Sequence, residues 1–229
     1  MQRFINNRAN FIDNFCSKHS WLDQLAINDY HLLAMLWNFF LIIIPFTLVY
    51  LLDVFWRKTK FSKLYQKIIA LIVSFFWLLF IPNTIYIVSD IRHLLDYCPA
   101  DSAGRVCVEH AWMIAFFFLY GSLGWVFFVY LLRQMSALLE KIYGLFASKV
   151  FILAIMPLIS LGVLLGLINR WNSWDIFIRP VAVANNSLIY FSNFSYLVDW
   201  LIFTVFLYIL YYLGKLLFKK NIKLSSFYR

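Results

Sequence analysis

The chain has 229 residues, of which 63% are hydrophobic, 21% aromatic and only 14% charged. A soluble domain of this length needs more polar surface, so the composition excludes an ordinary soluble protein. The formal net charge of +9 does not indicate nucleic-acid binding, because the basic residues stand in short loops beside apolar runs. That placement favours membrane lipids with anionic headgroups as partners.

The first thirty residues mix apolar and charged side chains. Phe11, Phe15 and Leu22 are interspersed with Asp13 and Lys18, so we do not expect the continuous apolar core of a cleavable signal here. This spacing predicts a helix that lies along the outer membrane surface or packs on the spans. We therefore divide the chain into an outer surface segment, residues 1–30, and a single transmembrane domain, residues 31–229.

Five apolar segments of 19 to 24 residues follow, each long enough to cross about 30 Å of hydrocarbon. The predicted spans are Leu32–Phe55, Ile68–Val88, Ala111–Leu132, Val150–Ile168 and Tyr196–Phe218. The predicted fold is thus an all-α integral membrane protein, a compact bundle of about five transmembrane helices.

The loops between the spans predict the orientation of this bundle. Alternate crossings place thirteen Lys and Arg residues on one side and seven on the other. The richer side is expected to be cytoplasmic, so the N-terminus is expected outside and the C-terminus inside. Cys98 and Cys107 then share an outer loop, where they either form a disulfide or remain unpaired thiols. No metal site and no cofactor are expected, because this loop offers too few ligands for zinc.

The second span ends in a polar stripe. Pro82 predicts a kink or break, because proline removes a backbone donor from the helix. At 100° per residue, an arc of about 80° beyond it contains Asn83, Tyr86, Asp90 and His93. Arg92 is expected on the opposite side of the helix. A polar stripe on a membrane helix must face protein or water, so it needs partners from other segments.

The predicted partners lie on the same outer side. The stretch RWNSWD, Arg170–Asp175, interrupts an apolar run with two charges, and Asp199 begins the fifth span. Asn38 lies about two turns into the first span, from which it can approach as a third helix. Trp171 and Trp174 are expected to anchor the loop at the interface. The structural alternative is that Asn172 or Asp175 caps a short helix, that Asp90 pairs with Arg170 as packing, and that Tyr86 is an ordinary belt aromatic.

These segments resemble a family of small bacterial multi-pass membrane proteins known only as a domain of unknown function. IPNTIYIVSDIRHLL is similar to its Leu-Pro-Asn-Ala-Pro-Tyr-Ile-x-Thr-Asp-x-x-His pattern, and RWNSWD is similar to its hexapeptide. LWNFFLIIIP resembles its first-span Trp-Asn…Pro element. Ile85 stands where the family commonly has proline, and Leu167 where it often has arginine. The resemblance implies a bacterial cytoplasmic membrane and the location of a site, but no activity.

Three functions remain open. The first is an enzyme or lipid-binding protein for a lipid, a lipid-linked envelope component or a lipoprotein, with His93 as general acid or base and Asp90 or Asp175 orienting it. Its substrate-binding residues are expected to be Asn83, Tyr86, Arg170, Trp171, Asn172, Trp174, Asp199 and Asn38. The second is a non-catalytic accessory or assembly protein. Gly162 and Gly166 suit close helix contact within the chain or, less favoured, in a dimer, which leaves the oligomeric state open.

The third function is transport. It is disfavoured because the middle of each span has no charge.

Overall fold

Helices form almost all of the part of the chain that the computed structural model describes. That part is the backbone of residues 26–27, 30–95 and 111–218, with the side chains of residues 32–92 and 111–218. Its only strands, β1 (Ala26–Ile27) and β2 (Tyr30–His31), form a two-residue antiparallel ladder. The helices in chain order are α3 (Leu32–Thr59), α4 (Leu64–Phe80), α5 (Pro82–Ser89), η1 (Asp90–Leu95), α6 (Trp112–Tyr143), α7 (Leu145–Leu167), α8 (Asp175–Ile178), α9 (Pro180–Ser192) and α10 (Phe194–Leu217). The predicted surface helix within residues 1–25, and the Cys98 and Cys107 pair, lie outside the described residues.

Five helical stretches are long and apolar enough to cross a membrane, which indicates a multi-pass membrane protein and matches the five apolar segments predicted. They are Leu32–Thr59, Leu64–Arg92, Trp112–Tyr143, Leu145–Leu167 and Phe194–Leu217. Helix α6 continues past the predicted end at Leu132, because Met135 and Leu138 are buried and keep its last turns packed. Its 32 residues measure about 48 Å, more than about 30 Å of hydrocarbon, so α6 tilts or projects beyond the membrane.

The predicted interruption of the second span is confirmed at Pro82. Helix α4 ends at Phe80, and Pro82 occupies the first position of α5, where its missing N–H costs nothing. After Ser89 the chain tightens into the 3₁₀ helix η1. The change of helix type alters which side chains share a face, because a 3₁₀ helix has 3.0 residues per turn.

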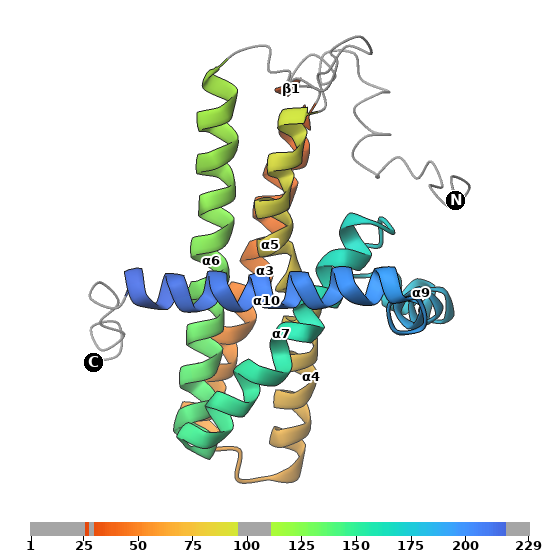
Figure 1. Cartoon of the computed structure of the whole chain (residues 1–229). Coiled ribbons are helices and arrows are strands. Elements are labelled where there is room, and N and C mark those ends of the chain that lie inside the picture. The colour runs from red at the N-terminus through yellow and green to blue at the C-terminus, as the bar shows by residue number, and fades with distance from the viewer. Residues whose placement is uncertain (1–25, 28–29, 96–110, 219–229) are drawn as a thin grey trace.

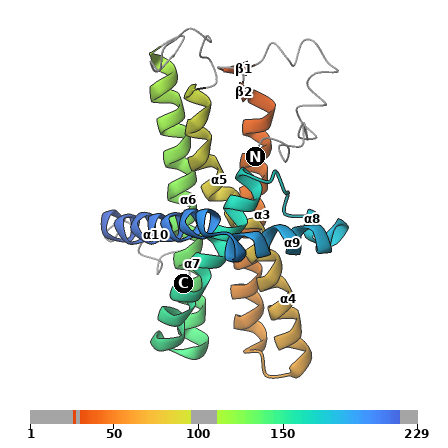
Figure 2. The same cartoon turned by 45° about the vertical axis from the view of Figure 1, so that its right-hand side comes forward.

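The five apolar helices do not all run side by side. In Figures 1 and 2, α3, α4–α5 and α6 run along one common direction, α7 is inclined to them, and α10 lies across them near mid-height. The expected bundle therefore holds for the first helices, whereas α10 crosses α6 and α7 instead of running alongside them. The predicted orientation of the two termini stays a prediction.

A proline in α7 helps to explain why α10 attaches there. Pro157 has no N–H, so the carbonyl of Leu153, four residues earlier, loses its bond within the helix. The hydroxyl of Tyr208 on α10 donates to that carbonyl, and the indole N–H of Trp200 donates to the carbonyl of Pro157 at 2.9 Å. The Leu153 carbonyl, which would otherwise be unsatisfied in an apolar environment, and the Pro157 carbonyl thus hold α10 across α7.

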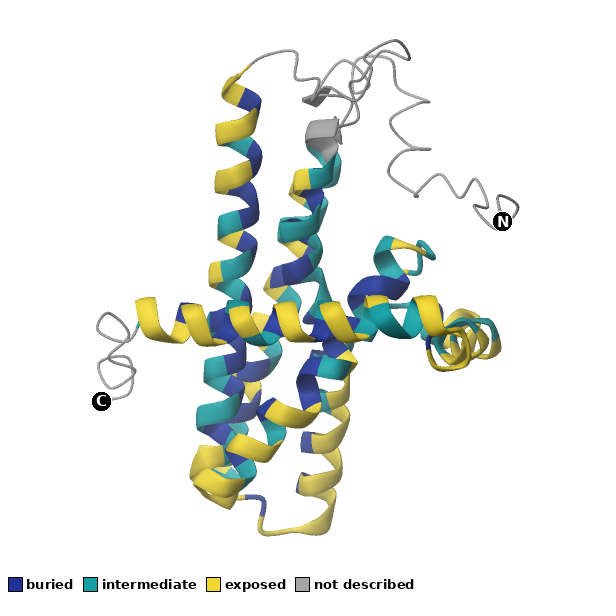
Figure 3. Cartoon of the chain, viewed as in Figure 1, coloured by how far each residue is buried: buried dark blue, intermediate teal, exposed yellow. Residues whose placement is uncertain are grey.

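Apolar side chains cover the outside of the molecule as well as its core. Phe118, Leu153 and Ile202 are each more than 60% exposed, and exposed positions follow the outer faces of the helices in Figure 3. This surface suits contact with lipid tails.

Glycines allow the helices inside to approach closely. A β-carbon on Gly124 of α6 would lie only 2.6 Å from the carbonyl oxygen of Thr84 on α5. Gly162 and Gly166 of α7 face Pro82 and Tyr86 of the same chain, which fits the favoured reading that this pair serves packing within the chain.

Candidate functional site

Three segments that are far apart in the sequence meet around the end of the second span. From α5, Asn83 donates through Nδ2 to the Ser173 hydroxyl at 3.2 Å, which joins the stripe to the loop after α7. From α3, Trp37 packs edge-on against Trp174 of that loop, with ring centroids 6.4 Å apart. The Trp-Asn element, the Pro-Asn…Tyr…Asp segment and the hexapeptide thus contribute to one neighbourhood.

A buried carboxylate lies at one side of this neighbourhood. Asp90 is fully buried, and its Oδ2 accepts from Asn38 Nδ2 at 3.1 Å and from the Tyr120 hydroxyl at 3.5 Å. These donors come from α3 and α6, so Asp90 connects three helices. A carboxylate in such a place needs hydrogen-bond donors, because its desolvation is costly. Asn38 therefore does approach as a third helix, as expected, and Tyr120 is a further partner that the sequence pattern did not single out for this site.

The hexapeptide forms a turn in which polar groups hydrogen-bond to one another. Oδ2 of Asp175 accepts from the backbone N–H of Asn172 at 2.7 Å and from its side-chain amide at 3.3 Å. Asp175 is buried and begins the short helix α8, while Asn172 is exposed. The capping alternative for these two residues was wrong, because Trp174 stands at the N-cap of α8 and no side chain caps that helix. The Asp175 carboxylate instead orders the turn before the helix.

Arg170 turns the chain at the end of α7 in an unusual conformation. Its φ of 58° lies in the left-handed region, where glycine or asparagine normally stands, and the next N–H, of Trp171, donates to the Leu165 carbonyl at 3.1 Å. The left-handed turn leaves the Arg170 side chain reaching toward α5. There its Nη1 donates to the Tyr86 hydroxyl at 3.4 Å.

A second arginine reaches the same hydroxyl. Nη2 of Arg92 lies 3.4 Å from the Tyr86 oxygen, and its guanidinium stands 5.8 Å from the centre of the Tyr86 ring. The expectation that Arg92 points away was wrong. In η1 each residue advances about 120° around the helix axis instead of 100°, which turns Arg92 toward the face that carries Tyr86. The long side chain of Arg92 then spans the remaining distance to the Tyr86 hydroxyl.

The two guanidinium groups form the electrostatic feature of the site. Because each has a nitrogen 3.4 Å from one oxygen, these nitrogens lie within twice that distance of each other. Within the part of the chain that the structure describes, neither Arg92 nor Arg170 forms an ion pair with a carboxylate. Among the described residues, Arg170 donates to Tyr86 and forms no ion pair with Asp90, which was the suggested packing partner. Two close cations that form no ion pair within the described part of the chain favour the binding of an anionic group.

The remaining predicted residues differ in their involvement. Trp171 packs against a small buried cluster that contains Leu165 and Tyr190, so it anchors the loop. Burial raises the pKa of Tyr190, which keeps its phenol protonated as it donates to Asn169 at 3.1 Å. Asp199 is exposed on α10 and joins none of the hydrogen bonds among the described residues. The side chain of His93 lies outside the described residues.

The described side chains at this site do not form a set of metal ligands. Among the described residues, no group of three His, Cys, Asp or Glu side chains comes together as a candidate metal site. Asp90 and Asp175 instead belong to separate hydrogen-bond groups, one centred on Asn38 and Tyr120 and the other on Asn172. The arrangement therefore offers cationic donors for an anion and two carboxylates engaged in holding the site together.

Comparison with known proteins gives a family. A family model described as "Protein of unknown function (DUF1361)" matches residues 37–212, which include all three segments that meet at this site. No curated protein matches the chain, and no solved structure matches it.

Proposed function

Since the chain belongs to the DUF1361 family of proteins of unknown function, we propose its function from the geometry of the site. In this proposal the protein binds the phosphate group of a lipid or lipid-linked envelope component at the outer face of a bacterial cytoplasmic membrane. The N-terminus lies outside and the C-terminus in the cytoplasm, following the excess of basic residues in alternate loops.

The observation that carries the proposal is the convergence of Arg92 and Arg170 on Tyr86. Two guanidinium groups repel each other, and neither forms an ion pair with a carboxylate among the described residues. Guanidinium groups bind phosphate oxygens through paired, charge-assisted hydrogen bonds. A phosphate placed beside Tyr86 would bond to both side chains and remove the repulsion between them.

The surroundings support a lipid as the source of that phosphate. The site lies among helices whose outer faces are apolar and exposed, including Leu36 on α3 and Ile178 on α8. Trp37 and Trp174 lie beside it, and tryptophan is favoured where lipid headgroups meet hydrocarbon. A lipid can therefore present its headgroup to the two arginines while its acyl chains follow the apolar surface.

The test is lipid binding by the full chain in phosphatidylcholine nanodiscs, with phosphatidylglycerol as the phosphate-bearing anionic probe. Arg170→Gln and Arg92→Gln are each expected to weaken binding about tenfold or more, since a charge-assisted hydrogen bond contributes about 1.5–3 kcal/mol. Arg179→Gln is the matched control, because the Arg179 side chain is exposed and makes no hydrogen bond or ion pair among the described residues. Equal binding by all three variants would remove the two arginines from the function.

A processing reaction on the bound lipid would extend this proposal to His93, Asp90 and Asp175. His93 would act as general acid or base, and the two carboxylates would orient it or the substrate. A labelled-lipid turnover assay tests this extension, since unchanged turnover in His93→Ala excludes His93 from the chemistry.

The second candidate is a non-catalytic accessory or assembly protein, favoured by the self-contained turn in the hexapeptide. If Asp175 and Asn172 serve only to shape that loop, its exposed face is a docking surface for another membrane protein. A stoichiometric partner that is lost in Asn172→Ala, with lipid binding retained, would favour this candidate over the first.

A further inference from the structure

Three hydrogen-bond donors converge at the end of the second span. Arg92 of η1 and Arg170 of the loop after α7 each donate to the Tyr86 hydroxyl at 3.4 Å. The phenol oxygen accepts both bonds, so its own O–H remains a donor, and this O–H has no acceptor among the described residues. All three side chains are partly exposed, so a ligand outside the chain can reach them. The site therefore offers three donor groups, of which two are positively charged.

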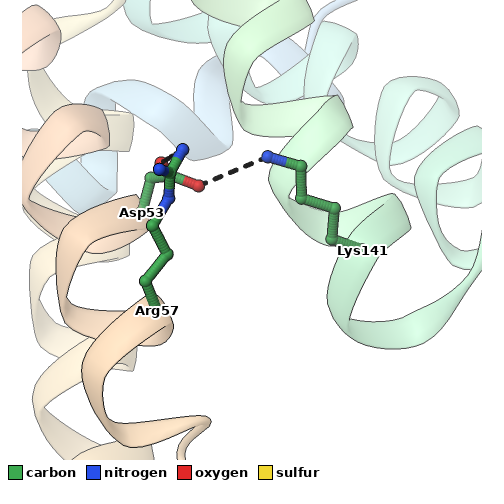
Figure 4. Close-up of polar contacts among 3 residues, drawn as sticks. All are labelled: Asp53, Arg57 and Lys141. Atoms are coloured by element: carbon green, nitrogen blue, oxygen red, sulfur yellow. Dashed lines mark ion pairs between the residues drawn. The ribbon is translucent and has the colours of Figure 1, made fainter. Parts of the chain in front are cut away.

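A different pair of cations in the chain is matched with a carboxylate. Near the C-terminal end of α3, Asp53 lies 2.7 Å from Arg57 and 3.5 Å from Lys141, and its side chain is only 8% exposed (Figure 4). Within the described part of the chain, neither Arg92 nor Arg170 has such a carboxylate partner. The charges of two neighbouring guanidinium groups are therefore left for a ligand to balance.

We infer that the ligand of this site is a phosphate monoester, which is the headgroup of a lipid that ends in its phosphate, as phosphatidic acid does. The inference rests on the proposed function and narrows its substrate class. A phosphate monoester carries nearly two negative charges above its second pKa of about 6, and it has three terminal oxygens that accept hydrogen bonds. A phosphate diester, the group in most membrane phospholipids, carries one charge and has two terminal oxygens.

The charges and the donors of the site both match the monoester. Each guanidinium binds one terminal oxygen through a charge-assisted hydrogen bond, and the O–H of Tyr86 donates to the third. A diester leaves one positive charge unbalanced and one donor without a terminal oxygen. A partly buried donor that is left unpaired weakens binding, which is how a site rejects a ligand that lacks the matching group. Tyr86 is therefore a specificity-determining residue of this site.

The experiment compares phosphatidic acid with phosphatidylmethanol, its methyl diester, for binding to the full chain in phosphatidylcholine nanodiscs. The two headgroups differ by one methyl group and one charge at about pH 9, where the monoester has lost its second proton. The wild type is expected to bind phosphatidic acid about tenfold more tightly than phosphatidylmethanol, since the monoester adds one charge-assisted hydrogen bond. Arg170→Gln is expected to lower this ratio to about two, and Tyr86→Phe to lower it about threefold. Arg179→Gln is the matched control for a lost charge and should keep the ratio of the wild type.

The outcomes separate this inference from the function on which it rests. Equal binding of the two lipids, with both weakened in Arg170→Gln, would retain the proposed phosphate site and overturn the monoester. Equal binding that Arg170→Gln leaves unchanged would refute the proposed function as well. A preference for phosphatidic acid that survives in both Arg170→Gln and Tyr86→Phe would come from another part of the chain and would also overturn the inference.

Inorganic phosphate distinguishes a lipid from a soluble source of the same dianion. It is expected not to displace phosphatidic acid from the wild type, because it lacks the acyl chains that follow the apolar surface. If inorganic phosphate displaces the lipid from the wild type and raises the unfolding temperature of the wild type but not of Arg170→Gln, the ligand is free phosphate and the lipid assignment is wrong.

Discussion

Replacing Arg170 by asparagine separates the role of its side chain from the role of its backbone. The left-handed conformation at φ 58° costs a residue other than glycine or asparagine about 1–2 kcal/mol. Asparagine tolerates this region, so the substitution recovers part of that cost. It also removes one hydrogen bond of 3.4 Å to Tyr86, which at that length and partial exposure contributes less than about 1 kcal/mol.

The two effects on stability are therefore nearly equal and opposite. Arg170→Asn is expected to change the free energy of unfolding by less than about 1 kcal/mol, or about 2–4 °C in the unfolding temperature. The same substitution removes one of the two guanidinium groups at Tyr86, so phosphatidylglycerol binding is expected to fall about tenfold or more. Thermal unfolding of the full chain in detergent and lipid binding in nanodiscs measure the two quantities separately.

The opposite pattern would refute this reasoning. If Arg170→Asn lowered the unfolding temperature by much more than a few degrees and left lipid binding intact, Arg170 would be a structural latch. The strained backbone would then serve the turn alone, and the two-arginine site would lose its main support. Arg179→Asn serves as the control for a lost surface charge in the same region, because its side chain is exposed.

Three further predictions concern the fold. Gly124→Ala places a methyl group 2.6 Å from a backbone oxygen of α5 and is expected to destabilise the protein by about 1–3 kcal/mol, whereas Gly121→Ala meets its nearest atom at 3.6 Å and should be nearly neutral in thermal unfolding. Tyr208→Phe removes the donor to the carbonyl that the proline of α7 leaves free; it is expected to cost about 1 kcal/mol, and an unchanged unfolding temperature would refute the docking argument. The topology is tested with single cysteines at Ser62 and Asn172 in a cysteine-free background. A cysteine at position 62 should react with an impermeant thiol reagent only from the cytoplasmic side, and one at position 172 only from the outer side. The reverse pattern would invert the proposed orientation.

The sequence predicted the helices better than their arrangement. Long apolar runs report directly on burial in a membrane, so the number of spans and the interruption at Pro82 followed from composition and proline chemistry. The crossing of α10 over α6 and α7 could not be predicted in this way. It depends on a hydrogen bond between Tyr208 and a carbonyl 55 residues earlier in the chain, which has no local signature.

Parts of the candidate site were hidden for similar reasons. The position of Arg92 follows from the change to 3₁₀ geometry after Ser89, which a constant 100° per residue does not anticipate. The left-handed turn at Arg170 has no signal in residue type, since arginine is not a residue that favours it.

The polar groups around the three motifs divide into two kinds, and the division carries the functional argument. Asp90 accepts from two other helices, and Asp175 accepts twice from its own loop, so both carboxylates have donors within the protein. The cations differ, because Arg92 and Arg170 meet only a neutral phenol among the described residues. A neutral acceptor does not compensate two positive charges held together, and a structural role would be served better by a carboxylate in place of Tyr86. The proposed function accounts for this difference, because the phosphate of a membrane lipid bound beside Tyr86 would compensate both charges.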